Sequence, residues 1–397
     1  MPKTKVAFVV QRNGKEVNGG AEHYCFLIAH LMQREWDIEI LTTRALDYMS
    51  WEDYYPEGVE TIDGVTVRRF GVDAPRDVEA FNHYSDKVLP NAENSTIEAS
   101  ETWMKLQGPN SSKLLNFIDL NRDDYEWFFF FTYLYASTYY GLQLVAEKSI
   151  LVPTAHDEPP IYLPIWDEWF KLPEYFIFNT IEERQFLEKR FPNIKFRGEI
   201  TGIGVTMPQD ASGIRFRQKF DIYLPYILYI GRIDPSKGSD ELFDFFIRFK
   251  EKHHTPLRLV LAGKAVMEIP EHKDIIHLGF IDEQTKFDAI EGSEFLVNSS
   301  RYESLSMVLL ESWSLEKATL VNGISDVMVG QCMRSNGGVW YKDYKTFELN
   351  TLFLLENAYR LTRMREFVET HYSWNIIREK YQNILEWNLQ KREGEDA

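Results

Sequence analysis

The chain has 397 residues, of which 61 are aspartate or glutamate and 44 are lysine or arginine, so its formal net charge at pH 7 is −17. This acidic balance argues against a protein that coats nucleic acid, because such a protein needs a basic surface to neutralise phosphates. Hydrophobic residues at 44% and charged residues at 26% exclude a largely disordered chain. The two cysteines, Cys25 and Cys332, are too few for a disulfide framework or a cysteine-rich zinc site, and they fit a reducing cytoplasm. The length predicts about two or three domains.

The first half of the chain alternates short apolar runs with helical patterns. The continuous apolar run 6–10 is typical of a strand that is buried on both faces, and it is too short for the core of a signal peptide. The uncharged stretch 127–146 has the length of a membrane span, but its serines, threonines and tyrosines favour a buried strand followed by a buried helix. Strands are predicted at 6–10, 38–41, 127–131, 150–154 and 175–179, a hairpin at 59–70 that turns at Asp63-Gly64, helices at 21–34 and from Thr180 onward, and a polar, partly helical stretch at 73–124.

The second half repeats this alternation after a break. Residues 208–221 are predicted to be a linker, because they combine glycine, serine and scattered charge with little periodicity. Two parallel sheets covered by helices are therefore expected, with a cleft between the carboxyl edges of their strands. The amphipathic segment 372–390 has no strand after it, so we expect a helix that packs across structure already built. Strands in this half are predicted at 227–230, 257–262, 275–278, 295–298 and 319–321, and helices at 240–250, 283–290 and 306–315.

Two of the loops that follow strands are suited to an anion. Gly19 and Gly20 lie between the first strand and the first helix, where exposed backbone N–H groups and the helix N-terminus favour negative charge. The alternative is an ordinary turn, since neither the dinucleotide fingerprint nor the P-loop is present. In the loop 231–238, Arg232 and Lys237 precede a helix and could hold a diphosphate, the arginine by its planar fork and the lysine as a point charge. The alternative there is a solvated loop.

Three further side chains are candidates for chemistry. Glu303 lies on a loop, and Glu311 lies in an apolar helix, where a buried carboxylate needs a partner such as a ribose diol or, as the alternative, a nearby lysine. His156 follows the strand 150–154 at the edge where the cleft is expected, and Asp157 could orient it, although a lone histidine also fits a structural role. The sequence contains no Asp-x-Asp, H-E-x-x-H, Cys-x-x-Cys or G-x-S-x-G motif, so it gives no support to a metal-dependent or serine-hydrolase mechanism.

Taken in order, these segments resemble the family 4 retaining glycosyltransferases of the GT-B fold over nearly the whole chain. The resemblance implies two Rossmann-like, doubly wound domains that face each other across a cleft. It assigns 1–207 to an N-terminal acceptor-side domain, 208–370 to a C-terminal domain that binds the donor nucleotide-sugar, and 371–397 to a helix that returns to the N-terminal domain. The resemblance rests on residues 19–22, 154–157, 202–205, 231–232, 237–238, 278–280 and 372–374, and on Glu303 and Glu311 with seven residues between them.

The resemblance also implies residue roles. Arg232 and Lys237 would bind the donor diphosphate and stabilise charge as the nucleotide leaves, while Glu303 and His156 would contact the transferred sugar. These four are the predicted catalytic residues. The donor-binding residues would be Gly19, Gly20 and Gly231 at the diphosphate, Phe280 and Ile281 at the base, Ser304, Leu305, Ser306 and Met307 at a phosphate, and Glu311 at the ribose. The family usually has Gly-Phe-Gly where this chain has Ser304-Leu305-Ser306, which narrows the space above the sugar and points to an uncommon donor sugar.

The implied function is a retaining, hexosyltransferase-like enzyme that moves a sugar from a nucleoside-diphosphate sugar, of UDP or GDP type, to a hydroxyl of a glycan or lipid-linked acceptor in surface polysaccharide biosynthesis. No metal and no further cofactor is implied. Arg76, Trp103 and Asp157 are predicted to line the acceptor side. We expect no nucleic acid partner, at most peripheral membrane contact, and a location in the cytoplasm that includes the inner face of the membrane. Two alternatives remain, a sugar-nucleotide epimerase of the same fold and a non-catalytic binding relative.

Overall fold

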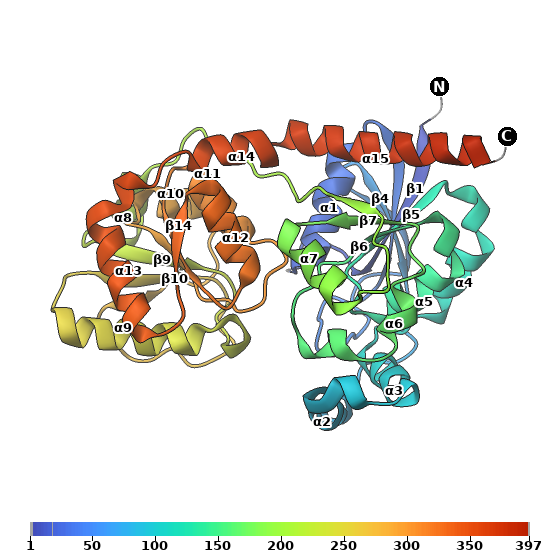
Figure 1. Ribbon diagram of the computed structural model, residues 1–397, viewed down its shortest axis with the longest axis horizontal. Helices are drawn as coiled ribbons and strands as arrows, with labels where there is room; N and C mark the ends of the chain where they lie inside the picture. Colours follow the sequence, from blue (N-terminus) through green and yellow to red (C-terminus); the bar gives the residue numbers. More distant parts are fainter. Residues whose placement is uncertain (1–2, 18, 396–397) are drawn as a thin grey trace. The chain divides into compact units, whose positions relative to one another are not determined.

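The computed structural model describes residues 3–17 and 19–395, with side chains up to residue 385. The chain divides into two compact units, Met1–Gly202 and Ile203–Ala397 (Figure 1). The division falls a few residues before the boundary expected after residue 207. The return of the last helix to the first domain stays a prediction, and each unit is described by itself.

In unit 1, the described residues form an eight-stranded sheet in the order β3-β4-β2-β1-β5-β6-β7-β8. All neighbouring strands are parallel except β3 and β4, which form the predicted hairpin. Its turn uses Asp63 at φ 47° and Gly64 at φ 88°, the positive values that a tight hairpin turn requires. The strands are β1 (Thr4–Arg12), β2 (Trp36–Thr43), β3 (Gly58–Ile62), β4 (Val65–Phe70), β5 (Trp127–Phe131), β6 (Ser149–Val152), β7 (Tyr175–Phe178) and β8 (Gly198–Ile200).

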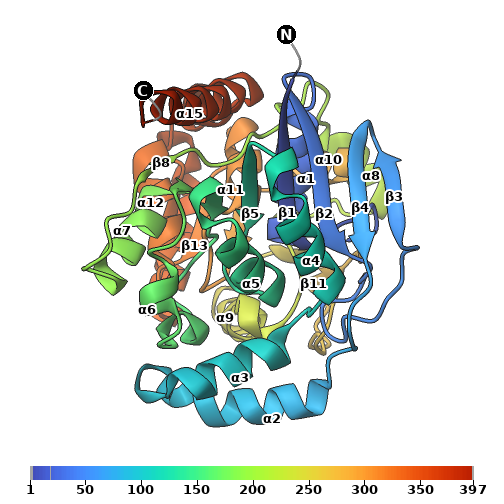
Figure 2. The same cartoon turned by 90° about the vertical axis from the view of Figure 1, so that its right-hand side faces the viewer.

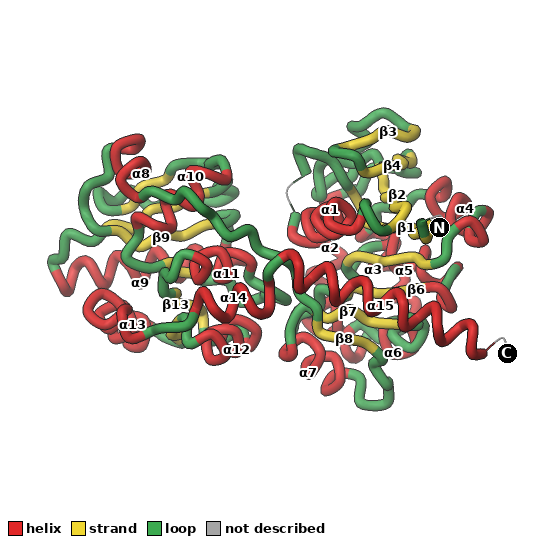
Figure 3. Tube along the Cα trace, turned by 90° about the horizontal axis from the view of Figure 1, so that it is seen from above, coloured by secondary structure: helices red, strands yellow, loops and turns green. Residues whose placement is uncertain are grey.

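Helices cover both faces of this sheet (Figure 3). Successive residues of a strand point to opposite faces, so in β5 Phe128 and Phe130 pack with Leu142 of α5, whereas Phe131 packs against Tyr24 of α1. The predicted strand and helix in the uncharged stretch 127–146 are thereby confirmed. The helices are α1 (Gly20–Met32), α2 (Val78–Val88), α3 (Ile97–Gln107), α4 (Ser112–Leu120), α5 (Ala136–Leu144), α6 (Trp166–Trp169) and α7 (Ile181–Arg190).

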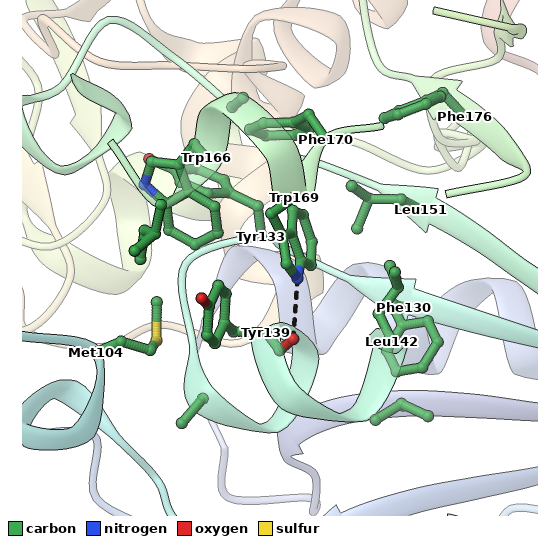
Figure 4. Packing of buried hydrophobic residues seen from close by; sticks show 14 of the residues in the cluster. Met104, Phe130, Tyr133, Tyr139, Leu142, Leu151, Trp166, Trp169, Phe170 and Phe176 are labelled. Atoms are coloured by element: carbon green, nitrogen blue, oxygen red, sulfur yellow. Dashed lines mark hydrogen bonds between the residues drawn. The ribbon is translucent and has the colours of Figure 1, made fainter. Parts of the chain in front are cut away.

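The aromatic residues gather in the core of unit 1. Tyr133, Tyr139, Trp166, Trp169 and Phe170 pack together near β5 and β6, and the Trp169 Nε1–H donates to the carbonyl oxygen of Tyr139 at 2.9 Å (Figure 4). The ring centroids of Tyr133 and Trp166 lie 4.9 Å apart in an edge-to-face arrangement, which aromatic pairs favour. Much of the chain's high aromatic content therefore stabilises this core. The α2–α3 pair lies at the lower edge of the unit (Figure 2), and Trp103 and Met104 of α3 pack into this same core.

In unit 2, the part of the chain that the structure describes forms a six-stranded parallel sheet in the order β11-β10-β9-β12-β13-β14. Leu228, Val260 and Leu296 face the core formed with α10, α11 and α14, and Ile227 and Leu259 face the core formed with α9 and α13. The elements are β9 (Tyr226–Ile230), α9 (Ser239–His253), β10 (Arg258–Ala262), β11 (Ile275–His277), α10 (Glu283–Gly292), β12 (Leu296–Asn298), α11 (Met307–Ser314), β13 (Thr319–Asn322), α12 (Asp326–Ser335), β14 (Gly338–Tyr341), α13 (Tyr344–Asn357), α14 (Met364–Tyr372) and α15 (Trp374–Glu395).

The predicted linker 208–221 is wrong in its second half, where the chain forms α8 (Gly213–Phe220). Ser212 caps this helix by accepting from the N–H of Arg215, and Phe216 is buried under it. Arg215 also pairs with Asp288 of α10 at 2.5 Å. The scattered charges that suggested a loop are therefore the solvent side of a short amphipathic helix. None of the described helices is both long enough and apolar enough to span a membrane.

Candidate functional site

The loop after β9 is shaped by close backbone approach at the edge of the sheet. Gly231 adopts φ 148°, and a Cβ atom on Gly263, which follows the neighbouring strand β10, would lie 1.9 Å from the carbonyl oxygen of Gly231. The phenol of Tyr229 donates to the carbonyl oxygen of Arg232 at 2.7 Å. The loop that carries Arg232 therefore has a fixed path at the carboxyl end of β9.

Arg232 and the residues after it are anchored by Asp234. This nearly buried carboxylate accepts from the backbone N–H of Ser236 at 2.7 Å, from that of Lys237 at 3.2 Å, and from the Arg232 guanidinium. Burial opposes its ionisation, but the hydrogen bond from Ser236 and the charge of Arg232 prevail and lower the pKa of Asp234 below its usual value. Arg232 remains more than a third exposed, so it is held in place and still accessible.

The structure brings Lys237 and Glu303 together. The Lys237 Nζ lies 2.9 Å from Glu303 Oε1, although the two residues are on the loops after β9 and β12. These loops touch at Gly238, where φ is 68° and a Cβ atom would lie 2.4 Å from the carbonyl oxygen of Ser299. The Ser299 hydroxyl donates to the carbonyl oxygen of Lys237 at 2.8 Å. Two of the predicted catalytic residues thus share one position at the sheet edge.

Glu311 has the partner that its burial requires. Its Oε1 accepts from the Lys286 Nζ of α10 at 2.5 Å, and its side chain is 12% exposed. Burial raises the pKa of Glu311, and the charge of Lys286 offsets part of that rise. The lysine pair that the sequence left open as an alternative is therefore present. The structure shows no second hydrogen bond at Glu311 among its described residues, so the carboxylate keeps acceptor capacity.

The predicted phosphate contact at the start of α11 is only partly accessible. Ser306 precedes the helix, and its buried hydroxyl accepts from Asn298 Nδ2 at 2.9 Å. This side chain therefore does not narrow the space above a sugar, as the family resemblance had suggested. Ser304, Leu305 and Met307 are partly exposed. At the base position, Phe280 is 79% exposed after β11, whereas Ile281 packs against the core.

In unit 1, Gly19 and Gly20 stand at the start of α1 as predicted, in two different surroundings. A Cβ atom on Gly19 would lie 2.1 Å from Glu22 Oε2, and Glu22 is held by a buried ion pair with Arg12 at 2.5 Å. At Gly20, no atom of the described residues lies within 4 Å of the position that a Cβ atom would take. Gly20 thus leaves open space next to the helix N-terminus, which is the property that an approaching anion needs.

His156 lies on a restrained loop after β6. Thr154 has φ 49°, which a threonine rarely adopts, and the N–H of Ala155 donates to Glu183 Oε1 at 2.7 Å. The His156 Nδ1 lies 3.5 Å from Glu158 Oε1. Glu183, on α7, also accepts from the N–H of Asn179 at 2.6 Å, and burial raises its pKa to about 8.

The prediction that Asp157 orients His156 is wrong. Asp157 is exposed and accepts from the Tyr162 phenol at 2.7 Å, whereas Glu158 has a carboxylate oxygen 3.5 Å from the His156 Nδ1. Sequence reasoning missed Glu158 and Glu183. Glu158 was visible as the second acid after His156, whereas Glu183 has the pattern of an ordinary acid in the first turn of a helix.

The structure does not support the acceptor-side role predicted for Trp103 and Arg76. Trp103 is 1% exposed and donates from Nε1 to the Ser85 hydroxyl at 3.0 Å between α3 and α2. Arg76 donates from Nε to the carbonyl oxygen of Gln107 at 3.0 Å, and burial lowers its pKa to about 10. Both side chains therefore hold the α2–α3 pair in place. The prediction failed because apolar residues at helical spacing form a core more often than the wall of a binding site.

A cavity of about 250 Å³ opens in unit 1 where α3, α4 and α5 meet. Its wall includes Asp73, Lys105, Asn110, Ser137 and Tyr140. The cavity was not anticipated, although three of these residues lie in the polar stretch 73–124. Among the described residues, no group of three or more histidine, cysteine, aspartate and glutamate side chains is arranged to hold a metal ion.

Comparison with known proteins agrees with this architecture. Residues 224–356 match the family described as glycosyl transferases group 1. No curated protein matches the chain in sequence. Similar solved structures include a sucrose-phosphate synthase from Thermosynechococcus elongatus (14% identity, 98% of this chain and 100% of that chain, TM-score 0.70). Others are an α,α-trehalose 6-phosphate synthase from Burkholderia multivorans (11%, 100% and 99%, 0.70) and Anabaena HepE in complex with UDP and glucose (12%, 96% and 99%, 0.66).

At these identities the likeness to solved structures establishes the fold alone. The expected fold class is confirmed, since both units are Rossmann-like α/β domains with parallel sheets and the likeness extends over nearly the whole chain. The chain therefore has the GT-B fold, and its residues 224–356 match the group 1 glycosyl transferases.

Proposed function

We propose that the protein is a retaining glycosyltransferase that moves a sugar from a UDP-type nucleotide sugar to a hydroxyl group. The observation that carries this proposal is the placement of Arg232, Lys237 and Glu303 at one edge of the unit 2 sheet, with Lys237 and Glu303 2.9 Å apart. These residues lie inside the segment that matches the group 1 glycosyl transferases. Among the similar structures, HepE is in complex with UDP and glucose, which supports UDP as the nucleotide.

The proposed chemistry uses this chain's own charges. The bond between the anomeric carbon and the diphosphate oxygen breaks, and Arg232 and Lys237 stabilise the charge that remains on the diphosphate. The acceptor oxygen bonds to the anomeric carbon on the same face, and its proton passes to the leaving diphosphate. Glu303 accepts from hydroxyls of the sugar, and Glu311 accepts from the ribose. Because two cations supply the positive charge, we propose that no metal ion is required.

The acceptor is proposed to be a hydroxyl of a glycan or of a lipid-linked glycan precursor, as in surface polysaccharide synthesis. The support comes from unit 1. Its cavity is lined by Asp73, Lys105, Asn110 and Ser137, which are side chains that hydrogen-bond to sugar hydroxyls. His156 follows the carboxyl end of β6, the edge of a parallel sheet at which ligands bind, and it is proposed to contact the transferred sugar.

Thermal unfolding in the presence of EDTA tests the donor site. UDP, GDP, ADP, dTDP and CMP would be added to the wild type, Arg232→Ala and Glu311→Ala. A ligand at 100 times its dissociation constant adds about 2.7 kcal/mol to the stability of the folded state. We expect UDP to stabilise the wild type, and we expect each substitution to weaken its binding about 10- to 100-fold, the effect of losing charge-assisted hydrogen bonds.

Arg248→Ala is the matched control. Arg248 is on α9, and its side chain is 48% exposed against 39% for Arg232. Its removal should leave the stabilisation by UDP unchanged. If no nucleotide stabilises the wild type, or if UDP binding survives both site substitutions, the donor-site assignment is wrong and a non-catalytic protein becomes the better interpretation.

A further inference from the structure

Lys286 forms an ion pair with Glu311 at the place where α10 packs against α11. Phe287 of α10 shares one core with Leu309 and Leu310 of α11, so the two helices are held against each other. The Lys286 Nζ lies 2.5 Å from Glu311 Oε1, and the two side chains are 21% and 12% exposed. Because water covers little of either group, each charge acts on the other more strongly than in a pair at the surface.

Lys286 is the cation that favours the charged form of Glu311. Burial raises the pKa of Glu311, the charge and the hydrogen bond of Lys286 lower it, and the nearby carboxylate of Glu283 raises it. Both of these neighbours belong to α10. Among the described residues, α14 and β12 also pack against α11, but neither brings a charged group that shifts this pKa. Without Lys286, the neutral carboxylic acid would therefore be favoured over a wider pH range.

The charge of Glu311 determines how its side chain can bind a ribose. A carboxylate has two oxygens that only accept hydrogen bonds, whereas a carboxylic acid carries a proton on one of them. The hydroxyls of a ribose are donors, and hydrogen bonds to an ionised acceptor are the stronger ones. Lys286 engages Oε1, and the structure shows no hydrogen bond at Oε2 among its described residues.

We propose that Lys286 is a positioning residue of the donor site, which keeps Glu311 ionised and holds its Oε1, so that Oε2 accepts from the ribose of the nucleotide. The ribose contact rests on the proposed function, whereas the effect of Lys286 on the charge of Glu311 does not. The charge can therefore be measured in the free protein, and the ribose contact with a nucleotide.

Carbon NMR of protein that contains glutamate labelled with ¹³C at the side-chain carboxyl measures the charge of Glu311 without any ligand. The spectrum of Glu311→Gln assigns its signal, and a titration gives the midpoint, the pH at which half of this carboxyl is protonated. In Lys286→Met, we expect the midpoint to lie about one pH unit or more above that of the wild type, because the opposite charge is lost. Lys286→Arg keeps the charge and should stay close to the wild type.

Lys219→Met is the matched control, because it removes another lysine that contacts α10. The Lys219 Nζ donates to Thr285 Oγ1 at 2.8 Å and lies 3.6 Å from an oxygen of Asp282. Its loss should leave the midpoint of Glu311 unchanged. An equal midpoint in Lys286→Met and the wild type, or an equal rise in Lys219→Met, overturns the proposal.

Lys286→Gln serves if Lys286→Met does not fold. Its neutral amide removes the charge and keeps a donor for the buried carboxylate of Glu311, so the midpoint should again rise. A midpoint equal to that of the wild type in this variant overturns the proposal in the same way.

The affinity for UDP then connects the charge of Glu311 to nucleotide binding. Calorimetry gives the ratio of the dissociation constant of Lys286→Met to that of the wild type, in which the ionisation of UDP itself cancels. Between the two midpoints found by NMR, we expect a ratio of about 10 or more, the effect of losing a charge-assisted hydrogen bond. One pH unit above the higher midpoint, Glu311 is ionised in both proteins, and the ratio should be several-fold smaller.

The pH dependence of this ratio separates positioning from a structural effect. If the midpoint rises in Lys286→Met but the ratio is the same at every pH, the positioning role is overturned, because a purely structural loss does not follow the charge of Glu311. If the midpoint rises but no nucleotide binds the wild type at any pH, the proposed function fails and the role of Lys286 toward Glu311 stands. If the midpoint is unchanged, that role fails whatever the affinity.

Discussion

Glu183 is a buried carboxylate with backbone donors and no cation among the described contacts. It accepts from the N–H groups of Ala155 and Asn179 and is 1% exposed. Burial raises its pKa from 4.5 to about 8, and the backbone hydrogen bonds offset part of that rise. Between these two values the folded state binds more protons than the unfolded state. Stability therefore falls as the pH rises from about 4.5 to about 8.

Glu183→Gln removes this titration and should flatten the pH dependence. One pKa unit corresponds to about 1.4 kcal/mol. Between about pH 4.5 and pH 8, the free energy of unfolding of the variant should therefore rise relative to that of the wild type by at most about 5 kcal/mol. Urea unfolding at pH 5, 6.5 and 8 measures the difference. Glu182→Gln changes a less buried acid in the same helical turn and should track the wild type. A constant difference between Glu183→Gln and the wild type would contradict the prediction.

At the scale of single residues, the sequence predicted which side chains lie on loops after strands, but it did not predict their hydrogen-bond partners. It placed Arg232, Lys237 and Glu303 on loops after strands, because the pattern of apolar runs shows where strands end. It named Asp157 beside His156 and missed Glu158, since the position of Glu158 depends on a hydrogen bond between the backbone groups of residues 156 and 158. Trp103 was wrongly assigned to the acceptor side for a related reason. The spacing of apolar residues shows which of them lie on one face of a helix, but it does not show whether solvent, a ligand or another helix covers that face.

At the scale of elements, two glycines at loop–helix junctions should respond in opposite ways to alanine. Gly238→Ala would place Cβ 2.4 Å from the Ser299 carbonyl oxygen at φ 68°, and it should destabilise the protein by about 1 to 3 kcal/mol. Gly20→Ala meets no atom of the described residues within 4 Å at the first position of α1, so it should leave stability unchanged or raise it by up to about 1 kcal/mol. Urea unfolding of both variants checks this contrast.

Ligand binding by Gly20→Ala adds a functional readout. If the diphosphate approaches the backbone at Gly20, the added methyl group should weaken the stabilisation by UDP-glucose. Because Gly20→Ala is expected to fold normally, such a loss would report on binding and not on folding. A loss of stability in Gly20→Ala, or equal stability in Gly238→Ala and the wild type, would contradict the structural assignment of these turns.

The elements themselves were largely predictable. The hairpin at 59–70, the strand 127–131 and the Thr180 cap of α7 appear where expected, because turn residues, apolar runs and capping side chains act over a few residues. The helix α8 was missed, since its core-facing residues Phe216 and Phe220 stand among charged residues and the backbone N–H of its cap residue Ser212 donates to Asp288 of α10. Strand order was also beyond the sequence, because the pairing of β1 with both β2 and β5 is a long-range contact.

At the scale of the whole molecule, the net charge of −17 opposes attachment to anionic membranes. We expect less than about a tenth of the protein to sediment with vesicles of phosphatidylglycerol and phosphatidylethanolamine at about 0.15 M salt, where charges beyond about 8 Å are screened. Vesicles of phosphatidylcholine should give the same result. Strong sedimentation with the anionic vesicles alone would instead reveal a local basic patch that the overall charge conceals, and peripheral membrane contact would follow.

The ion pair between Lys237 and Glu303 makes the proposed donor site a site of exchange. A diphosphate that takes the Lys237 donor facing Glu303 displaces that carboxylate, which is 17% exposed and then needs new donors. The hydroxyls of an attached sugar supply them. Free UDP supplies none, so Glu303 would compete with it for the lysine. The same pair would therefore favour the intact nucleotide sugar over the spent nucleotide, and its re-formation would help to expel the product after each turnover.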